Sequence, residues 1–275
     1  MDVVSSGHVR KATSKPFPFF QLPRELRDHV YESLVANDSH GCVRRVSSPH
    51  PVDFGLRGAI TLAQLLTNHQ FHEELEHTFV RCALLYFNDM LPDMYPGTDN
   101  PIYMDHGILL PGVLSNIQNV KVILCGATYR QPPIGAPNMA RLEEDIPIIE
   151  GRLVSKVPGM RKLELELRNQ QRLDVTQSWT EVKEERKTMR ARWVRCLSQM
   201  DETWKSTTFL KRLDFYEQSD FGPSWLSNDY WRSRKLLVWR YTRDGAIETF
   251  EQKTLEWENE VSDYVASLSP RLTAW

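Results

Sequence analysis

A proline-led helix with one apolar stripe, at residues 22–34, is the feature that most constrains how this chain folds. Pro23 stands where a first-turn proline loses no helical hydrogen bond, and Glu25 places negative charge near the helix N-terminus. Spacings of three and four residues put large apolar side chains on one face. These are Leu26, Val30 and Leu34, with Tyr31 beside them, whereas Arg24, Arg27, Asp28 and Glu32 are expected to turn outward. The pattern predicts an amphipathic docking helix.

The chain around this helix divides into a tail and a helical module. Residues 1–15 are polar and lack periodicity, which is typical of a flexible tail. Residues 37–57 are rich in Gly, Pro and Ser and are predicted to form a loop. A second helix follows, because large side chains recur at helical spacing at Leu62, Leu65, Leu66, His69, Phe71, Leu75 and Phe79. We expect the helical module to cover residues 16–87.

Residues 88–275 have a different pattern and are expected to form an α/β interaction domain. Alternating apolar residues predict strands at 117–125, 160–168, 210–216 and 235–242, the last turning at 243–245 into a hairpin with 246–251. Helices are predicted at 139–144 and 175–204. The lead-ins to the first three strands resemble one another, but their spacing is too uneven for a leucine-rich repeat. The expected fold class is α+β, a helical module packed on an α/β layer with a mixed sheet and a late β-hairpin.

Composition limits the partners and the compartment. Hydrophobic residues make up 41% and charged residues 25%, which is typical of a folded soluble chain. A net charge of -2 argues against a protein that coats nucleic acid. No apolar run reaches the roughly 20 residues of a membrane span, and the N-terminus lacks a signal-peptide core. Four scattered cysteines are expected to be reduced thiols. We therefore expect no membrane partner and a cytoplasmic or nuclear location.

Catalytic signatures are weak. The acidic and histidine side chains at 69–77 do not have zincin spacing, since His72 and His77 are five residues apart. The sequence contains no Gly-x-Ser-x-Gly elbow and no nucleotide-binding glycine loop. We predict no catalytic residue, metal or cofactor, although a dispersed active site stays open.

An aromatic stretch at residues 221–231 is a second candidate binding feature. Trp225, Tyr230 and Trp231 stand among Gly, Pro, Ser and Asn residues, which favour a loop. Aromatic side chains are enriched at binding hot spots. They also anchor long loops to a core, and the sequence leaves both interpretations open.

Two motifs carry a resemblance to a known family. The first is Leu22-Pro23-x-Glu25-Leu26-Arg27 followed by Tyr31 and Leu34, and the second is the stretch 65–74, LLTNHQFHEE. Together they resemble the F-box-like proteins of filamentous fungi. In F-box proteins this helix binds the Skp adaptor of a cullin ubiquitin ligase, and the C-terminal domain selects the target. The resemblance implies that seven residues are partner-facing or module-forming: Leu22, Pro23, Glu25, Leu26, Val30, Tyr31 and Leu34.

Three functional hypotheses follow. The chain is a substrate receptor that links an unknown target to a cullin-type ligase, a stand-alone binding scaffold, or an enzyme with an unrecognised site. The receptor predicts an exposed stripe at 22–34. The scaffold predicts that the stripe is packed internally and the aromatic loop exposed, and an enzyme needs a pocket with convergent titratable groups.

Overall fold

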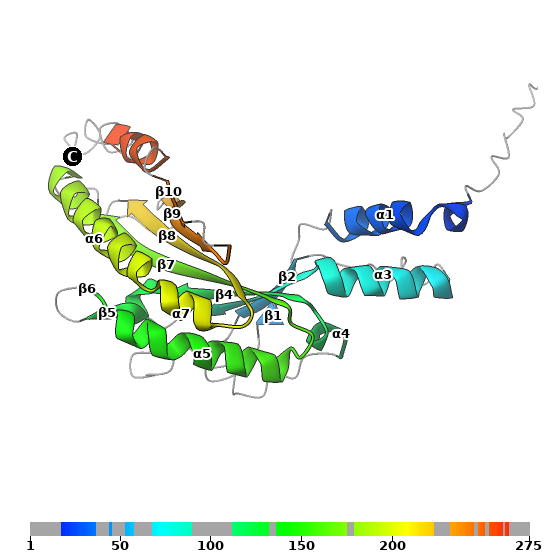
Figure 1. Cartoon of the computed structure of the whole chain (residues 1–275). Helices are drawn as coiled ribbons and strands as arrows, with labels where there is room; N and C mark the ends of the chain where they lie inside the picture. The colour runs from blue at the N-terminus through cyan, green and yellow to red at the C-terminus, as the bar shows by residue number, and fades with distance from the viewer. Residues whose placement is uncertain are drawn as a thin grey trace, which may run out of the picture.

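The structure is a computed structural model. It describes residues 18–36, 44–45, 53–57, 68–89, 112–131, 136–174, 179–222, 232–244, 247–250, 253–260 and 262–263. The chain builds a large sheet that is flanked on one side by helices, and a pair of N-terminal helices extends from one end of it (Figure 1). This arrangement confirms the α+β class.

The sheet has eight strands in the order β1-β2-β3-β4-β7-β8-β9-β10. The four central strands, β3, β4, β7 and β8, run parallel, and antiparallel strands flank them on both sides. The expected mixed sheet and the late hairpin, formed by β9 and β10, are both present. The strand bounds are β1 Arg44–Arg45, β2 Asp53–Arg57, β3 Leu84–Asp89, β4 Asn119–Cys125, β7 Lys162–Asp174, β8 Leu210–Gly222, β9 Arg232–Thr242 and β10 Ile247–Thr249.

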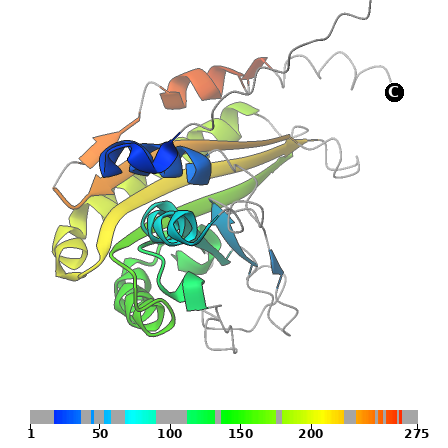
Figure 2. The same ribbon diagram turned by 90° about the vertical axis from the view of Figure 1, so that its right-hand side faces the viewer.

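Helices cover one face of this sheet. Helices α5 (Met139–Lys156), α6 (Trp179–Gln199) and α7 (Asp201–Ser206) lie on the same side of the strands (Figures 1 and 2). The short helix α4 (Gly112–Ser115) precedes β4. A 3₁₀ helix, η4 (Gly126–Tyr129), and the two-stranded ribbon of β5 (Arg130–Gln131) and β6 (Ala136–Pro137) precede α5. A helix at residues 253–260 follows β10.

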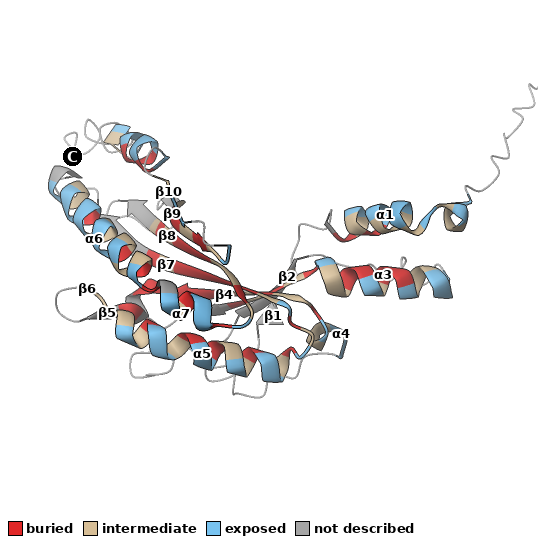
Figure 3. Ribbon diagram, viewed as in Figure 1, coloured by how far each residue is buried: buried red, intermediate tan, exposed pale blue. Residues whose placement is uncertain are grey.

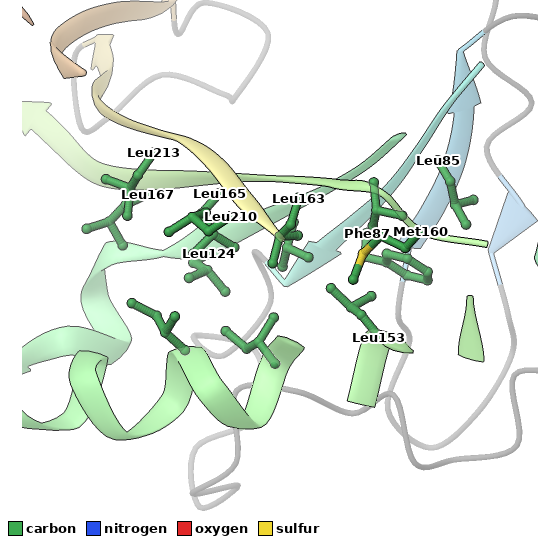
Figure 4. Close-up of a cluster of buried hydrophobic side chains, with 14 of the residues drawn as sticks. Leu85, Phe87, Leu124, Leu153, Met160, Leu163, Leu165, Leu167, Leu210 and Leu213 are labelled. Carbon is green, nitrogen blue, oxygen red and sulfur yellow. The ribbon is translucent and has the colours of Figure 1, made fainter. Parts of the chain in front are cut away.

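The core lies between the sheet and these helices. Leucines of β4, β7 and β8 point toward α5 (Figure 4), and the inward helix faces are buried (Figure 3). Trp193 of α6 stacks on Phe215 of β8 with ring centroids 5.3 Å apart. This apolar packing fixes which face of each strand is buried, so the alternate side chains point to the other face.

The N-terminal helices form a packed pair, and their buried residues belong to the same hydrophobic cluster as those of the sheet. Helix α1 (Arg24–Ala36), preceded by the 3₁₀ helix η1 (Phe19–Gln21), lies against α3 (His69–Cys82). The carboxyl end of α3 is tied to β4, because Asn119 Nδ2 donates to the carbonyl of Arg81 at 2.6 Å and Gln118 N donates to that of Val80 at 2.9 Å. The α1–α3 pair therefore stands at the edge where the parallel strands begin.

Several expected elements differ from the structure. Residues 44–45 and 53–57, predicted as loop, are strands, and β3 lies within the part expected to be helical, so the sheet begins before residue 88. The helix predicted at 139–144 extends to Lys156, because Leu142, Ile146, Ile149 and Leu153 form a buried stripe that continues past Pro147. The long helix predicted at 175–204 is two helices, α6 and α7, which break at Met200. None of the described helices is long and apolar enough to cross a membrane.

Candidate docking site

Helix α1 has two apolar faces, and only one of them is buried. Tyr31 is fully buried and Val35 nearly so, on the side that contacts α3. Leu26 and Val30 point away from α3 and are 50% and 41% exposed. Of the other residues that the sequence singled out, Pro23 and Glu25 are exposed, and Leu22 and Leu34 are half-buried. The stripe predicted at 22–34 is therefore divided between the outside of the module and its interior.

The structure does not describe three of the predicted site residues, Trp225, Tyr230 and Trp231. Leu62, Leu65 and Leu66, which were predicted to belong to the second helix, also fall outside the described residues. The helix that the structure describes begins at His69, where Asn68 accepts a hydrogen bond from Phe71 N at 2.7 Å as its N-cap.

Glu74 of α3 is the centre of the contact between the two helices. Arg27 of α1 binds both of its carboxylate oxygens, with Nε and an Nη each 2.9 Å away. Tyr31 donates its hydroxyl at 3.0 Å, and Gln70 donates from the same helix at 3.0 Å. Arg24 adds an ion pair at 3.1 Å. One buried carboxylate thus receives donors from three successive turns of α1 and from Gln70 of α3.

Arg27 also fixes the start of α1. Its guanidinium donates to the carbonyl of Leu22 at 2.6 Å and to that of Phe20 at 3.3 Å. The segment before Pro23 is therefore held against the helix that follows it. This arrangement corrects the expectation that Arg27 turns outward, because its side chain is only 12% exposed. The partner that draws it inward is 47 residues away in the sequence, so no local pattern indicated it.

Aromatic rings close the same interface. Phe19 of η1 and Phe71 of α3 each pack against Tyr31, with ring centroids 5.5 and 5.2 Å apart and nearly perpendicular planes. Edge-to-face pairs of this kind add to the energy of burial. Tyr31 therefore belongs to the interior of the module rather than to its surface.

The environment of Glu74 shifts its ionisation. Burial disfavours the carboxylate, but the hydrogen bonds from Arg27, Gln70 and Tyr31 outweigh burial and lower the pKa of Glu74 to about 2. Burial and the hydrogen bond to Glu74 raise the pKa of Tyr31 above its ordinary value of 10.0. Glu74 is thus ionised and Tyr31 protonated at neutral pH, as the hydrogen bonds require.

A pH dependence of stability follows from the low pKa of Glu74. Its contribution is fully present above the ordinary pKa of 4.5 and is lost as the pH falls toward 2, because the unfolded chain then takes up a proton that the folded one does not. We expect the stability difference between the wild type and Glu74→Gln to be largest above about pH 5 and to shrink steadily below it. Denaturant unfolding of both proteins at a series of pH values measures this difference. A difference independent of pH would contradict the role given to the Glu74 charge.

The histidines of α3 form pairs on the surface. His69 Nδ1 lies 3.5 Å from Glu73 Oε2, and His72 Nε2 lies 3.5 Å from Glu76 Oε2. In each pair the two residues are one helical turn apart, and their side chains are 43% exposed or more. No group of three metal-ligating side chains comes together in the part of the chain that the structure describes.

A separate cavity of about 560 Å³ lies between α6, the β9–β10 hairpin and the helix at 253–260. Its walls are apolar at Val194, Val238 and Leu255, and basic at Lys187 and Arg195. The one carboxylate among its lining residues, Glu258, is paired with Arg190 at 2.9 Å. The cavity therefore brings together no pair of free acid and base groups among its lining side chains.

Comparisons of the chain with protein-family models, with curated proteins and with solved structures found no significant match.

Proposed function

We propose that the α1–α3 module docks a protein adaptor of the Skp type, and that the chain is a substrate receptor which links a target to a cullin-type ubiquitin ligase. The partner-facing surface in this proposal consists of Leu26 and Val30, with Leu22, Pro23, Glu25 and Leu34 around them. Tyr31 serves the module from inside.

The exposure of Leu26 and Val30 is the observation that carries this proposal. They stand one turn apart on the same helix, and no other two exposed large apolar side chains among the described residues do so. Isolated exposed apolar residues are ordinary, but neighbouring ones on a rigid helix favour a contact surface. The receptor hypothesis predicts exposed apolar side chains on this helix, and the exposed part of the stripe, Leu26 and Val30, supports it.

The rigidity of the module supports the same proposal. Arg27 and Glu74 hold α1 on α3, and Arg81 of α3 binds Glu32 of α1 at 2.9 Å near the other end. The exposed side chains therefore keep a fixed geometry without a partner, which lowers the entropic cost of binding. Resemblance of the two motifs to F-box-like proteins identifies the adaptor class.

Co-purification of the full chain with a fungal Skp adaptor tests the proposal. We expect a stable complex by size exclusion, and we expect Leu26→Asp, Val30→Asp to weaken it at least about 100-fold, because removing two central apolar anchors costs about 3 kcal/mol or more. The matched control is Ile148→Asp, Val154→Asp on α5, whose side chains are 45% and 39% exposed. This control is expected to bind like the wild type.

Folding of the variants is measured by circular dichroism and thermal unfolding. Exposed positions tolerate such changes with little loss of stability, so both double variants are expected to fold. A folded Leu26→Asp, Val30→Asp variant that still binds the adaptor would contradict the proposal. A variant that unfolds would mean that the stripe is part of the core, and would favour the scaffold hypothesis.

A further inference from the structure

The face of the sheet opposite the helices is lined by charged side chains. Because Leu163, Leu165 and Leu167 of β7 point to the helices, Glu164, Glu166 and Arg168 point the other way. The strand registers extend this pattern into rows across the sheet. One row is Lys121, Glu164 and Arg212, and the next includes Glu166, Asp214, Arg240 and Glu248.

The carboxylates lie at the bottom of this face. Arg212 binds Glu164 at 2.7 Å, and Arg240 binds Asp214 at 2.8 Å. Lysine and arginine side chains are longer than the acidic ones and reach over them, with their charged ends toward water. Glu166 is 1% exposed, whereas Lys235, which contacts it, is 33% exposed. The acidic groups are thus buried under a layer of cations.

Glu166 has more cationic partners than its own charge can balance. Lys121, Arg168 and Lys235, from β4, β7 and β9, all form ion pairs with it. We call these four residues the Glu166 cluster. Burial disfavours the Glu166 carboxylate, but the hydrogen bonds from Lys121 and Lys235 outweigh burial and lower its pKa to about 2. Three positive charges therefore share one negative charge, which leaves an excess of two in a chain whose net charge is -2.

We propose that the Glu166 cluster is a binding surface for an acidic segment of a protein partner. The chemistry that would recognise it is two or more carboxylates presented to Lys121, Arg168 and Lys235 from outside the sheet. This inference does not rest on adaptor docking, because it concerns another surface of the chain and is tested without the adaptor.

The cations have donors left for such a partner. A guanidinium has five N–H donors, and Arg168 directs its Nε to Glu166. Lys235 Nζ also lies 3.9 Å from the centre of the Tyr216 ring, which holds it at the surface of the sheet. The ion pairs with Glu166 fix these side chains in place, so little rotamer freedom is lost when a second anion binds.

A protein segment fits this surface better than a nucleic acid does. Phosphate backbones need an extended row of cations, and affinity comes from many such contacts. Here Glu164, Glu166 and Asp214 interrupt the rows, so the cations of these described rows do not form one continuous line. A short acidic peptide matches an excess of two charges over a small area.

The test uses the full chain and a fluorescently labelled peptide that contains six glutamates, with a six-glutamine peptide as the reference. Fluorescence anisotropy measures the affinity at low salt and at about 0.15 M salt, where exposed charges are screened beyond roughly 8 Å. We expect the glutamate peptide to bind at least about 10-fold more tightly than the glutamine peptide. Lys235→Gln and Arg168→Gln should each weaken its binding about 3- to 10-fold.

Two further variants distinguish binding at the Glu166 cluster from a general effect of the protein's charge. Lys187→Gln removes one positive charge from α6, on the other side of the sheet, and is expected to change the affinity less than twofold. Glu166→Gln removes the shared anion and should strengthen peptide binding, the opposite sign to Lys235→Gln. Should Glu166→Gln not fold by circular dichroism, the two cation variants carry the test.

Three results would overturn the proposal. The first is equal binding of the glutamate and glutamine peptides, and the second is an effect of Lys187→Gln as large as that of Lys235→Gln. The third is that a single-stranded oligonucleotide of the same charge binds more tightly than the peptide and responds to the same variants, which would make nucleic acid the ligand of this face.

Discussion

Glu74→Ala is expected to destabilise the α1–α3 module by about 3–5 kcal/mol, because breaking a buried ion pair leaves the remaining charge without a partner. The guanidinium of Arg27 would lose both carboxylate oxygens, and the Tyr31 hydroxyl would lose its acceptor. The guanidinium of Arg27 would keep its hydrogen bonds to the carbonyls of Phe20 and Leu22, but it would have no carboxylate of α3 to bind. The Arg27 side chain contributes both to the docking of α1 on α3 and to the turn before Pro23, and Glu74 is its partner across the two helices.

The neighbouring carboxylate gives a matched control. Glu73 is in the same helix and is exposed, and its ion-pair partner among the described residues is His69 on the surface. Glu73→Ala is therefore expected to change stability by no more than about 0.5 kcal/mol. A loss as small as this for Glu74→Ala would mean that the buried network contributes little net free energy.

The measurement must report on the module itself. Every tryptophan of the chain lies at or after residue 179, so tryptophan fluorescence follows the α/β part. Amide hydrogen exchange of peptides from α1 and α3 follows the module. In Glu74→Ala these peptides should exchange faster while those of β7 and β8 keep their protection.

Local periodicity was sufficient to predict much of the fold. The alternation of Leu163, Leu165 and Leu167 with charged residues predicted β7, and the turn at 243–245 predicted the β9–β10 hairpin. Both signals lie within a few residues of the structure that they indicate. Two of the elements that were missed, β2 and β3, are short, and their strand character comes from pairing with each other and with β4.

The same distinction applies to the candidate site. Helical spacing placed apolar residues along α1, but it could not decide whether Val30 or Tyr31 faces α3, since both neighbours are apolar. That choice depends on Glu74, which contacts Tyr31 from 43 residues away. The charged rows of the sheet likewise combine Lys121, Glu166 and Lys235 from three strands. Local sequence patterns do not predict contacts between segments that are distant in the sequence.

Gly159→Ala is expected to destabilise the α/β part by about 3 kcal/mol or more, because the added methyl would overlap with backbone atoms that have no room to move. A Cβ at this position would lie 2.4 Å from the carbonyl oxygen of Asn116 and 2.6 Å from its Cα. Gly159 N donates to the carbonyl of Ser115 at 3.1 Å, and Lys162 N donates to that of Gln118 at 2.9 Å. The lead-ins to β4 and β7 are thus hydrogen-bonded on both sides of the contact.

A second glycine separates this steric cause from any general effect of adding a methyl group. Gly151 lies inside α5, and a Cβ there would meet no atom within 4 Å. Gly151→Ala is expected to stabilise the chain by about 0.5–1 kcal/mol, because alanine loses less conformational entropy than glycine in a helix. Denaturant unfolding followed by tryptophan fluorescence measures both variants. A loss of stability in Gly159→Ala together with a gain in Gly151→Ala would establish that the contact between the β4 and β7 lead-ins leaves no room for a side chain at Gly159. An unchanged stability of Gly159→Ala would mean that the two lead-ins separate easily.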